Sequence, residues 1–189
     1  GTGFEFEYDP AWVKFEPNHC AVCSEAISLE LKKEQEQAEL EAEQKKRDMR
    51  WLAICPVRFR DTDQSRLPEK LAVALGQWNS GQSTNLAILG PSGTCKTRAG
   101  FLALREAHED GAWCEAISHS KFAEIARDSA FGDNSEKARK RMSALERCDV
   151  LFIDDIGKPP STERADAELE SLIDSRYANG KPTIWTANA

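Results

Sequence analysis

The feature that most constrains this chain is segment 85–97, where an apolar run leads into a turn of small residues and then into Lys96 and Thr97. A helical pattern follows directly. A strand, a turn of backbone N–H groups and a helix N-terminus in this order form a site for an anion. Gly90 and Gly93 allow the backbone to fold tightly and to approach phosphate oxygens. The segment therefore predicts a loop that binds the phosphates of a nucleotide.

Each position of this loop has an expected role. Lys96 is expected to reach the β- and γ-phosphates, and the Thr97 hydroxyl is expected to bind Mg²⁺. Cys95 stands where this motif usually has glycine, so a Cβ must fit beside the bound phosphate. The alternative interpretation is a plain strand-to-helix turn that contains a lysine. The predicted nucleotide-binding residues are Gly90, Pro91, Ser92, Gly93, Thr94, Cys95, Lys96 and Thr97.

A second motif follows the apolar run 150–153, which has the pattern of a buried parallel strand. Asp154 and Asp155 come directly after it, and ligands of open α/β sheets bind at this end of the strands. We expect Asp154 to hold Mg²⁺ opposite Thr97, and Asp155 to orient and deprotonate an attacking water. Taken alone, two aspartates at the end of a strand often indicate only a solvated turn. Together with the loop, they predict an NTPase core.

A third strand, 183–186, ends near Asn188, which we expect to contact the lytic water or the γ-phosphate. Strand and helix patterns alternate along residues 85–188, which predicts an α/β fold with a parallel sheet flanked by helices. The last of these helices ends at about Asn179, and 135–147 is a basic helix between the first and second motifs. A core of this type needs at least one more strand, so we expect a chain that is truncated at its C-terminal end.

Composition limits the functional classes. The chain has 189 residues, of which 40% are hydrophobic and 30% charged, and no apolar run is long enough to span a bilayer. Without a signal-peptide pattern, we expect a cytoplasmic protein with no membrane partner. The net charge of −7 argues against a broadly basic nucleic-acid surface but leaves room for a local basic groove. Six scattered cysteines do not indicate a disulfide framework, and Cys55 and Cys148 are predicted to be small buried residues.

Residues 1–54 are expected to form an N-terminal appendage, and residues 55–189 the ATPase core. Cys20 and Cys23 form a Cys-x-x-Cys pair, which is half of a zinc site. Because no second pair follows, two thiols at the start of a helix is the alternative that we favour. Residues 24–53 predict one long charged helix with too few apolar residues for a core-facing stripe. We interpret it as a solvated arm, with a partner-binding helix as the alternative.

The loop 90–97, the run 151–157, the triplet 175–177 and the segment 181–188 together resemble the AAA+ helicase loaders. These are the DnaC/DnaI-type proteins of bacteria and phages, and the IstB-type transposition helpers share the same core. The segment 57–61 is also similar to the region upstream of the core in phage versions. The resemblance covers roughly residues 55–189. It implies an ATP–Mg²⁺ site between subunits of a homo-oligomer, slow hydrolysis, single-stranded DNA and a hexameric replicative helicase as partner.

The resemblance leads to a P-loop ATPase in which Lys96, Asp155 and Asn188 act in catalysis. The basic helix 135–147 is the candidate DNA contact, with a solvated helix face as the alternative. Arg176 precedes the third strand, so it is not the usual trans-acting arginine, and a place at a subunit interface is one interpretation. A helicase loader is the leading hypothesis. The others are a transposition helper that acts on duplex DNA, and an ATP-sensing adaptor in which Cys95 suppresses turnover.

Overall fold

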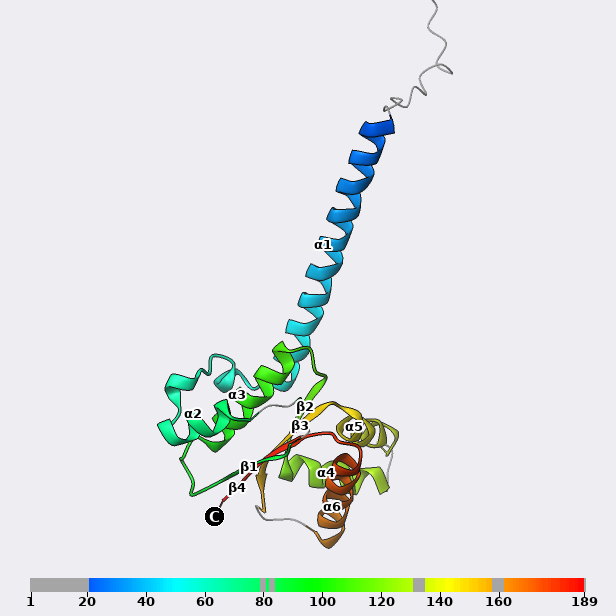
Figure 1. The fold of residues 1–189 in the computed structure, drawn as a ribbon. Helices are drawn as coiled ribbons and strands as arrows, with labels where there is room; N and C mark the ends of the chain where they lie inside the picture. The colour runs from blue at the N-terminus through cyan, green and yellow to red at the C-terminus, as the bar shows by residue number, and fades with distance from the viewer. Residues whose placement is uncertain (1–20, 79–80, 82–83, 131–134, 158–161, 189) are drawn as a thin grey trace, which may run out of the picture. The chain divides into compact units, whose positions relative to one another are not determined.

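A computed structural model describes residues 21–78, 81, 84–130, 135–157 and 162–188 (Figure 1). The chain divides into two compact units, residues 1–48 and residues 49–189. The first 20 residues of the predicted appendage, which include Cys20, lie outside the described residues. None of the described helices combines the length and the apolar character that a membrane crossing needs.

The first unit consists, in its described part, of most of helix α1 (Ala21–Ile54). Its described side chains from residue 27 to residue 46 are all exposed, including Leu29 and Leu40. Gln37 donates to Glu41, and Gln44 to Asp48, over distances of 3.2 and 2.9 Å along the helix. This confirms the predicted long solvated helix, because its surface is covered by charged and amide side chains rather than by an apolar stripe.

The second unit is built around a parallel sheet of four described strands in the order β1-β4-β3-β2. The strands are β1 (Leu86–Leu89), β2 (Cys114–Ser118), β3 (Val150–Ile156) and β4 (Thr183–Ala187). The helices of this unit, besides the end of α1, are α2 (Glu69–Gly76), α3 (Lys96–Glu109), α4 (His119–Ala130), α5 (Ser135–Arg147) and α6 (Glu163–Ala178). Two short 3₁₀ turns, η2 (Val57–Phe59) and η3 (Gln64–Arg66), precede α2. The predicted alternation of strands and helices is confirmed.

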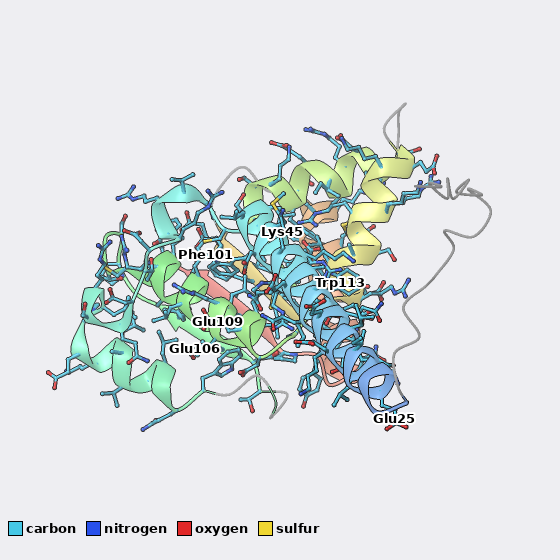
Figure 2. All side chains as sticks on the ribbon, turned by 90° about the horizontal axis from the view of Figure 1, so that it is seen from above. Glu25, Lys45, Phe101, Glu106, Glu109 and Trp113 are labelled. Carbon is cyan, nitrogen blue, oxygen red and sulfur yellow. The ribbon has the colours of Figure 1, made fainter. Side chains whose placement is uncertain are left out.

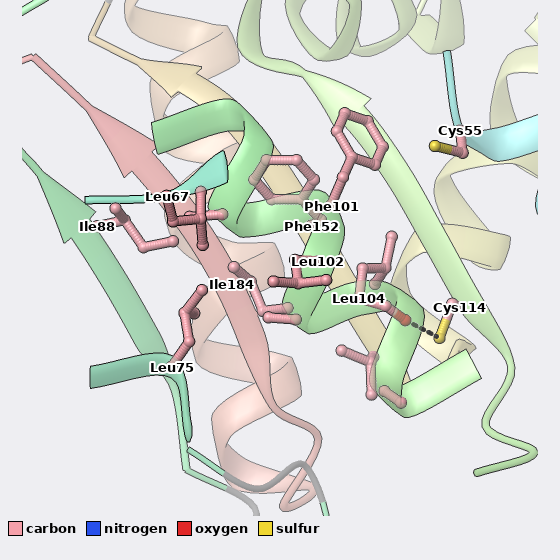
Figure 3. Packing of buried hydrophobic residues seen from close by; sticks show 14 residues of the cluster. Cys55, Leu67, Leu75, Ile88, Phe101, Leu102, Leu104, Cys114, Phe152 and Ile184 are labelled. Atoms are coloured by element: carbon pink, nitrogen blue, oxygen red, sulfur yellow. Dashed lines mark hydrogen bonds between the residues drawn. The ribbon is translucent and has the colours of Figure 1, made fainter. Parts of the chain in front are cut away.

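Strands β2, β3 and β4 separate their side chains between two hydrophobic clusters, because successive residues of a strand point to opposite faces. Phe152 and Ile184 belong to the cluster under α2 and α3, which Figure 3 shows from close by. Leu151 and Ile153 belong to the other cluster, together with residues of α4, α5 and α6. The sheet is therefore covered by helices on both faces, and the face under α3 is the one on which residues 150, 152 and 154 of β3 follow one another.

Helix α3 is almost completely buried along its first half, and Figure 2 shows Phe101 near its start and Glu106 and Glu109 further along. The Phe101 ring meets the edge of the Phe152 ring, with the centroids 4.9 Å apart and the planes at 87°. Gly100 lies against the same ring: a Cβ there would come within 2.4 Å of Phe152 Cζ. This absence of a side chain allows the helix that follows the predicted loop to lie close to the sheet.

Three cysteines of the second unit, Cys55, Cys114 and Cys148, are buried free thiols, and we call them the three buried thiols. Burial raises the pKa of Cys55 to about 11, of Cys114 to about 12 and of Cys148 to about 11. The prediction that Cys55 and Cys148 are small buried residues is confirmed. Within the described residues there is no group of three or more His, Cys, Asp or Glu side chains that could hold a metal ion.

Arg176 is not at a surface, so its interpretation as an interface residue is wrong. Its side chain is fully buried. The guanidinium donates to Thr183 Oγ1 at 3.0 Å and to a set of main-chain carbonyls at 2.8–3.3 Å. The carbonyls are those of Leu145, Glu146, Cys148, Asp149 and Pro182. Arg176 therefore satisfies the carbonyls at the end of α5, which have no partner inside that helix.

The boundary of β3 also differs from the prediction. Asp154 and Asp155 do not follow the strand but lie inside it, because pairing with β4 resumes at Ile156, opposite Ala187. The register shifts between Ile153 and Ile156, and Asp155 has a φ of 59°. A left-handed residue within a strand produces a bulge. The bulge bends the strand at the two predicted carboxylates.

Candidate functional site

The predicted phosphate loop lies between β1 and α3, and its backbone bends sharply. Gly90, Gly93 and Cys95 all have positive φ values, of 154°, 83° and 62°. A Cβ at Gly93 would meet nothing within 4 Å, so the loop is open on that side. Thr94 Oγ1 donates to the Pro91 carbonyl at 2.9 Å and closes the turn. The loop thus forms an open curve that leads directly into the N-terminus of α3, where backbone N–H groups have no partner inside the helix.

Cys95 has the left-handed conformation that glycine adopts without strain, with φ 62° and ψ 19°. The residue is half-buried and packs against the hydrophobic cluster under α3. It also lines the cavity that the loop encloses. The structure therefore accommodates a side chain where the motif has glycine, by placing part of it against the core.

Lys96 is the first residue of α3, and its side chain is 93% buried, with an exposed fraction of only 7%. Its amine donates to the carbonyls of Gly90 and Pro91, at 2.8 and 2.7 Å. The third acceptor is Asn188 Oδ1, at 3.0 Å. The lysine therefore connects the loop with the residue that follows β4, although these two predicted site residues are far apart in the sequence.

Thr97 and Asp154, the two predicted metal ligands, are in direct contact. Thr97 Oγ1 lies 2.9 and 3.1 Å from the two carboxylate oxygens of Asp154. The contact follows from the alternation along β3, since residue 154 is on the same face as Phe152, under α3. Thr97 is in the first turn of that helix, so hydroxyl and carboxylate meet at one edge of the sheet.

Thr186 is a member of this cluster that the sequence analysis missed. Its side chain is fully buried, and its hydroxyl donates to Asp154 Oδ1 at 2.6 Å. Thr186 Oγ1 in turn accepts the backbone N–H of Asp155 at 2.8 Å. A signal for it was present, because Thr186 is two residues before Asn188 and lies on the same face of β4. Thr186 holds both aspartates in place across the bulge.

Most of the predicted residues, but not Gly90, Pro91 or Asp154, line a cavity of about 300 Å³. It is lined by Arg58, Phe59, Ser92, Gly93, Thr94, Cys95, Lys96, Thr97, Arg98, Asp155 and Asn188. The structure thus brings Asp155 and Asn188 to the same cavity as the loop. It also adds residues from η2 and the first turn of α3 that the sequence analysis did not assign to the site, namely Arg58, Phe59 and Arg98.

The structure does not test the pair predicted as half of a zinc site. Cys20 lies outside the described residues, and the side chain of Cys23 is not described either. Cys55 is part of the core, where its thiol contacts the Pro56 carbonyl at 3.7 Å. It is therefore not available as a further ligand.

Comparison with protein families gives one result for most of the chain. The family model described as "IstB-like ATP binding protein" matches residues 29–189. Comparison with curated proteins gives no match.

Solved structures show the same fold at low sequence identity. The DnaC helicase loader is 19% identical with a TM-score of 0.57, and the match covers 71% of this chain and 80% of that one. DnaI is 14% identical with a TM-score of 0.58, over 70% and 75% of the two chains. DnaA from Aquifex aeolicus, with AMPPCP bound, is 23% identical with a TM-score of 0.53, over 64% of this chain and 37% of DnaA. The chain therefore corresponds to little more than a third of the DnaA structures that it matches.

Proposed function

Because this chain belongs to the IstB-like family of ATP-binding proteins, we propose that it binds ATP and Mg²⁺ in the cavity at the sheet edge and hydrolyses ATP slowly. One observation carries the proposal. Three separate motifs converge there, with Lys96 hydrogen-bonded to Asn188 and Thr97 hydrogen-bonded to Asp154. Neither bond is needed to build the sheet, which is complete without them. Both place cationic and oxygen-rich groups where a nucleotide with a divalent ion would be recognised.

The donor chemistry fits both ligands. Mg²⁺ prefers oxygen ligands, and a hydroxyl and a carboxylate are already in contact at Thr97 and Asp154. The buried amine of Lys96 is held by three neutral oxygens, which phosphate oxygens would replace at a gain in charge pairing. The bound Mg²⁺ would supply neutralisation of charge on the β- and γ-phosphates.

The protein's own groups would do the rest of the work. The loop amides and Lys96 would hold the phosphates and favour the charge that develops during transfer. Asp155, which is fixed by Thr186 and shaped by the bulge, would orient the water and accept its proton. Asn188 would contact the γ-phosphate from the tip of β4. An arginine from a neighbouring subunit would accelerate the reaction, so we expect the isolated chain to be slow.

A lysine substitution tests the site. We expect Lys96→Ala to abolish ATP binding, measured by calorimetry or by fluorescence of a labelled nucleotide. Lys70→Ala is the matched control, since Lys70 is an exposed lysine in α2, away from the cavity. Unchanged ATP affinity of Lys96→Ala would refute the assignment of the site.

The proposed biological role is that of a helicase loader, in which residues 55–189 are the ATPase and residues 1–54 the appendage that binds a helicase. The similarity of fold to DnaC and DnaI supports this role. The exposed basic side chains of α5 are candidates for single-stranded DNA, and Lys137 and Arg147 are the strongest. Others on this helix are engaged, because Lys140 pairs with Glu136 at 2.6 Å and Arg141 with Glu115 at 2.5 Å.

A charge-reversal variant tests the DNA contact. We expect the double variant Lys137→Glu, Arg147→Glu to bind a fluorescent single strand more weakly and with a smaller salt dependence. Reversal of two exposed charges on α4, such as Lys121 and Arg127, is the control. Equal losses in both variants would indicate a general charge effect and not a contact of α5.

A transposition helper is the second candidate, since the matching family model carries the IstB description. Such a protein would prefer duplex DNA and bind a transposase. Competition between single-stranded and duplex DNA of equal length for the ATP-bound protein separates the two functions. Preference for the single strand supports the loader, and preference for the duplex supports the helper.

An ATP-sensing adaptor without turnover is the third candidate. Cys95→Gly restores the usual loop residue at a position that already has a left-handed backbone. We expect this variant to keep the fold, and comparison of ATP turnover with and without DNA tests the role of the thiol. If Cys95→Gly is no faster than the natural chain, Cys95 does not limit turnover.

A further inference from the structure

Arg58 lines the same cavity of about 300 Å³ as the loop and Lys96, although it belongs to η2, far from the loop in sequence. Its side chain is exposed. Within the described residues, it makes no hydrogen bond and no ion pair. A cation without a partner that faces an anion-binding loop is a candidate ligand for the same anion.

The backbone that carries Arg58 is firmly held. The next residue, Phe59, stacks on Phe101 with ring centroids 5.2 Å apart. Arg60 donates to the carbonyls of Cys55 and Leu52, at 3.1 and 2.8 Å, and so fixes the turn to the end of α1. The backbone from which the Arg58 side chain extends is therefore fixed beside the cavity, which lowers the entropic cost of binding a ligand.

The neighbouring arginines are already used by the fold. Arg98 donates to Thr62 Oγ1 at 3.1 Å and lies over the Phe59 ring, 5.8 Å from its centroid. Arg105 pairs with Glu109 at 2.7 Å. Arg60 caps α1. Among these four side chains, Arg58 alone is left to bind something outside the protein fold.

We infer that Arg58 binds the phosphate chain of the nucleotide in cis, from the side of the cavity opposite the loop. This inference rests on the proposed ATP site and adds a second cation to it. Lys96 would neutralise the phosphates from within the loop, and the planar guanidinium would add two parallel hydrogen bonds to phosphate oxygens. Arg58 is thus a binding residue of the site, and the η2 segment is part of the nucleotide pocket.

The test is a titration of ATP into the full chain and its Arg58→Ala variant. We expect affinity to fall about tenfold to a hundredfold, as for loss of a hydrogen bond to a charged group. Arg58→Lys should recover part of the affinity, because it restores the charge without the fork. Arg66→Ala is the matched control: Arg66 is an exposed arginine in η3 that pairs with Asp61 and does not line the cavity.

Inorganic tripolyphosphate distinguishes a phosphate contact from stacking on the base. Displacement of labelled ATP gives the dissociation constant of tripolyphosphate. We expect Arg58→Ala to raise this constant by the same factor as the dissociation constant of ATP. A loss for ATP alone would overturn the phosphate assignment, and an ATP affinity within twofold of the natural chain would overturn the inference entirely. Failure of the proposed function is a different outcome, because in that case the natural chain itself would bind no ATP.

Discussion

Replacing Gly100 by alanine has two opposing effects on the stability of the protein: a gain in helix propensity and a clash with the Phe152 ring. The contacts of Gly100 show which effect is larger. In an exposed helix interior the change stabilises by about 1 kcal/mol, because alanine has the higher helix propensity. At this position the added Cβ would lie 2.4, 2.5 and 3.0 Å from three carbons of the Phe152 ring. Ordinary contact needs about 3.5–4.0 Å, so the ring must retreat by about 1 Å.

The Phe152 ring has little room to retreat. It is fully buried, and its edge is fixed against Phe101. Overpacking of this kind costs about 1–3 kcal/mol. After the propensity gain is subtracted, we expect Gly100→Ala to lose up to about 2 kcal/mol, which lowers the melting temperature by up to about 8 °C for a chain of this size. Because Asp154 is two residues beyond Phe152, the variant should also bind ATP more weakly.

Thermal and urea unfolding of matched variants measures this effect. Gly76→Ala is the control, since it is also a helix residue but a Cβ there meets nothing within 4 Å. We expect this control to be at least as stable as the natural chain. Adding Phe152→Leu to Gly100→Ala should recover stability in a double-mutant cycle. A Gly100→Ala variant that is more stable than the natural chain would refute the packing argument.

Three further predictions concern Arg176, the three buried thiols and Cys95. Arg176→Met should lose at least about 3 kcal/mol in urea unfolding, because buried carbonyls lose their donors, whereas the exposed Tyr177→Ala should change little. The three buried thiols have raised pKa values when folded, so the unfolded chain deprotonates first, and stability should fall as pH rises from about 9 towards 11. A flat profile there would contradict this. Cys95 should react with a thiol reagent faster than these three at pH 8, as followed by peptide mapping, and ATP should slow it.

The order of elements was predictable because each carries a local signal. Helix α3 begins where the sequence pattern predicts it, directly after the loop that contains Gly90 and Gly93. The basic helix α5 was also predicted with its observed bounds. Boundaries that depend on partner strands were less accurate. β3 continues through its two aspartates only because β4 offers a pairing partner at Ala187, and no local pattern shows this.

The role of Arg176 could not be read from sequence, because a charged side chain is buried only when enough acceptors surround it. Its acceptors are main-chain carbonyls that become available where α5 ends and where β4 begins. Main-chain groups carry no sequence signal. The structural role of Arg176 therefore depends on tertiary contacts, which the interpretation as an interface residue did not take into account.

Arg58 was overlooked for the opposite reason, since the segment 57–61 carried a resemblance but no chemical pattern. Its place at the cavity depends on Phe59, which packs on α3 through Phe101. The same helix carries Lys96 and Thr97 at its start. Packing of one aromatic pair thus fixes the distance between an upstream turn and the loop, so Phe59→Ala should weaken ATP binding without removing any charged group.

Strand β4 is what joins the two halves of the site. Its alternating side chains place Ile184 in the core under α3, then Thr186 on Asp154, and then Asn188 on Lys96. A hydroxyl and an amide, spaced two residues apart, thus connect the carboxylate of β3 with the lysine of the loop. Any change in the position of Lys96 on binding a phosphate would be transmitted through β4 to Asp154. Thr97, which follows Lys96 and contacts Asp154 directly, is the shorter connection, and β4 provides a second one through Asn188 and Thr186.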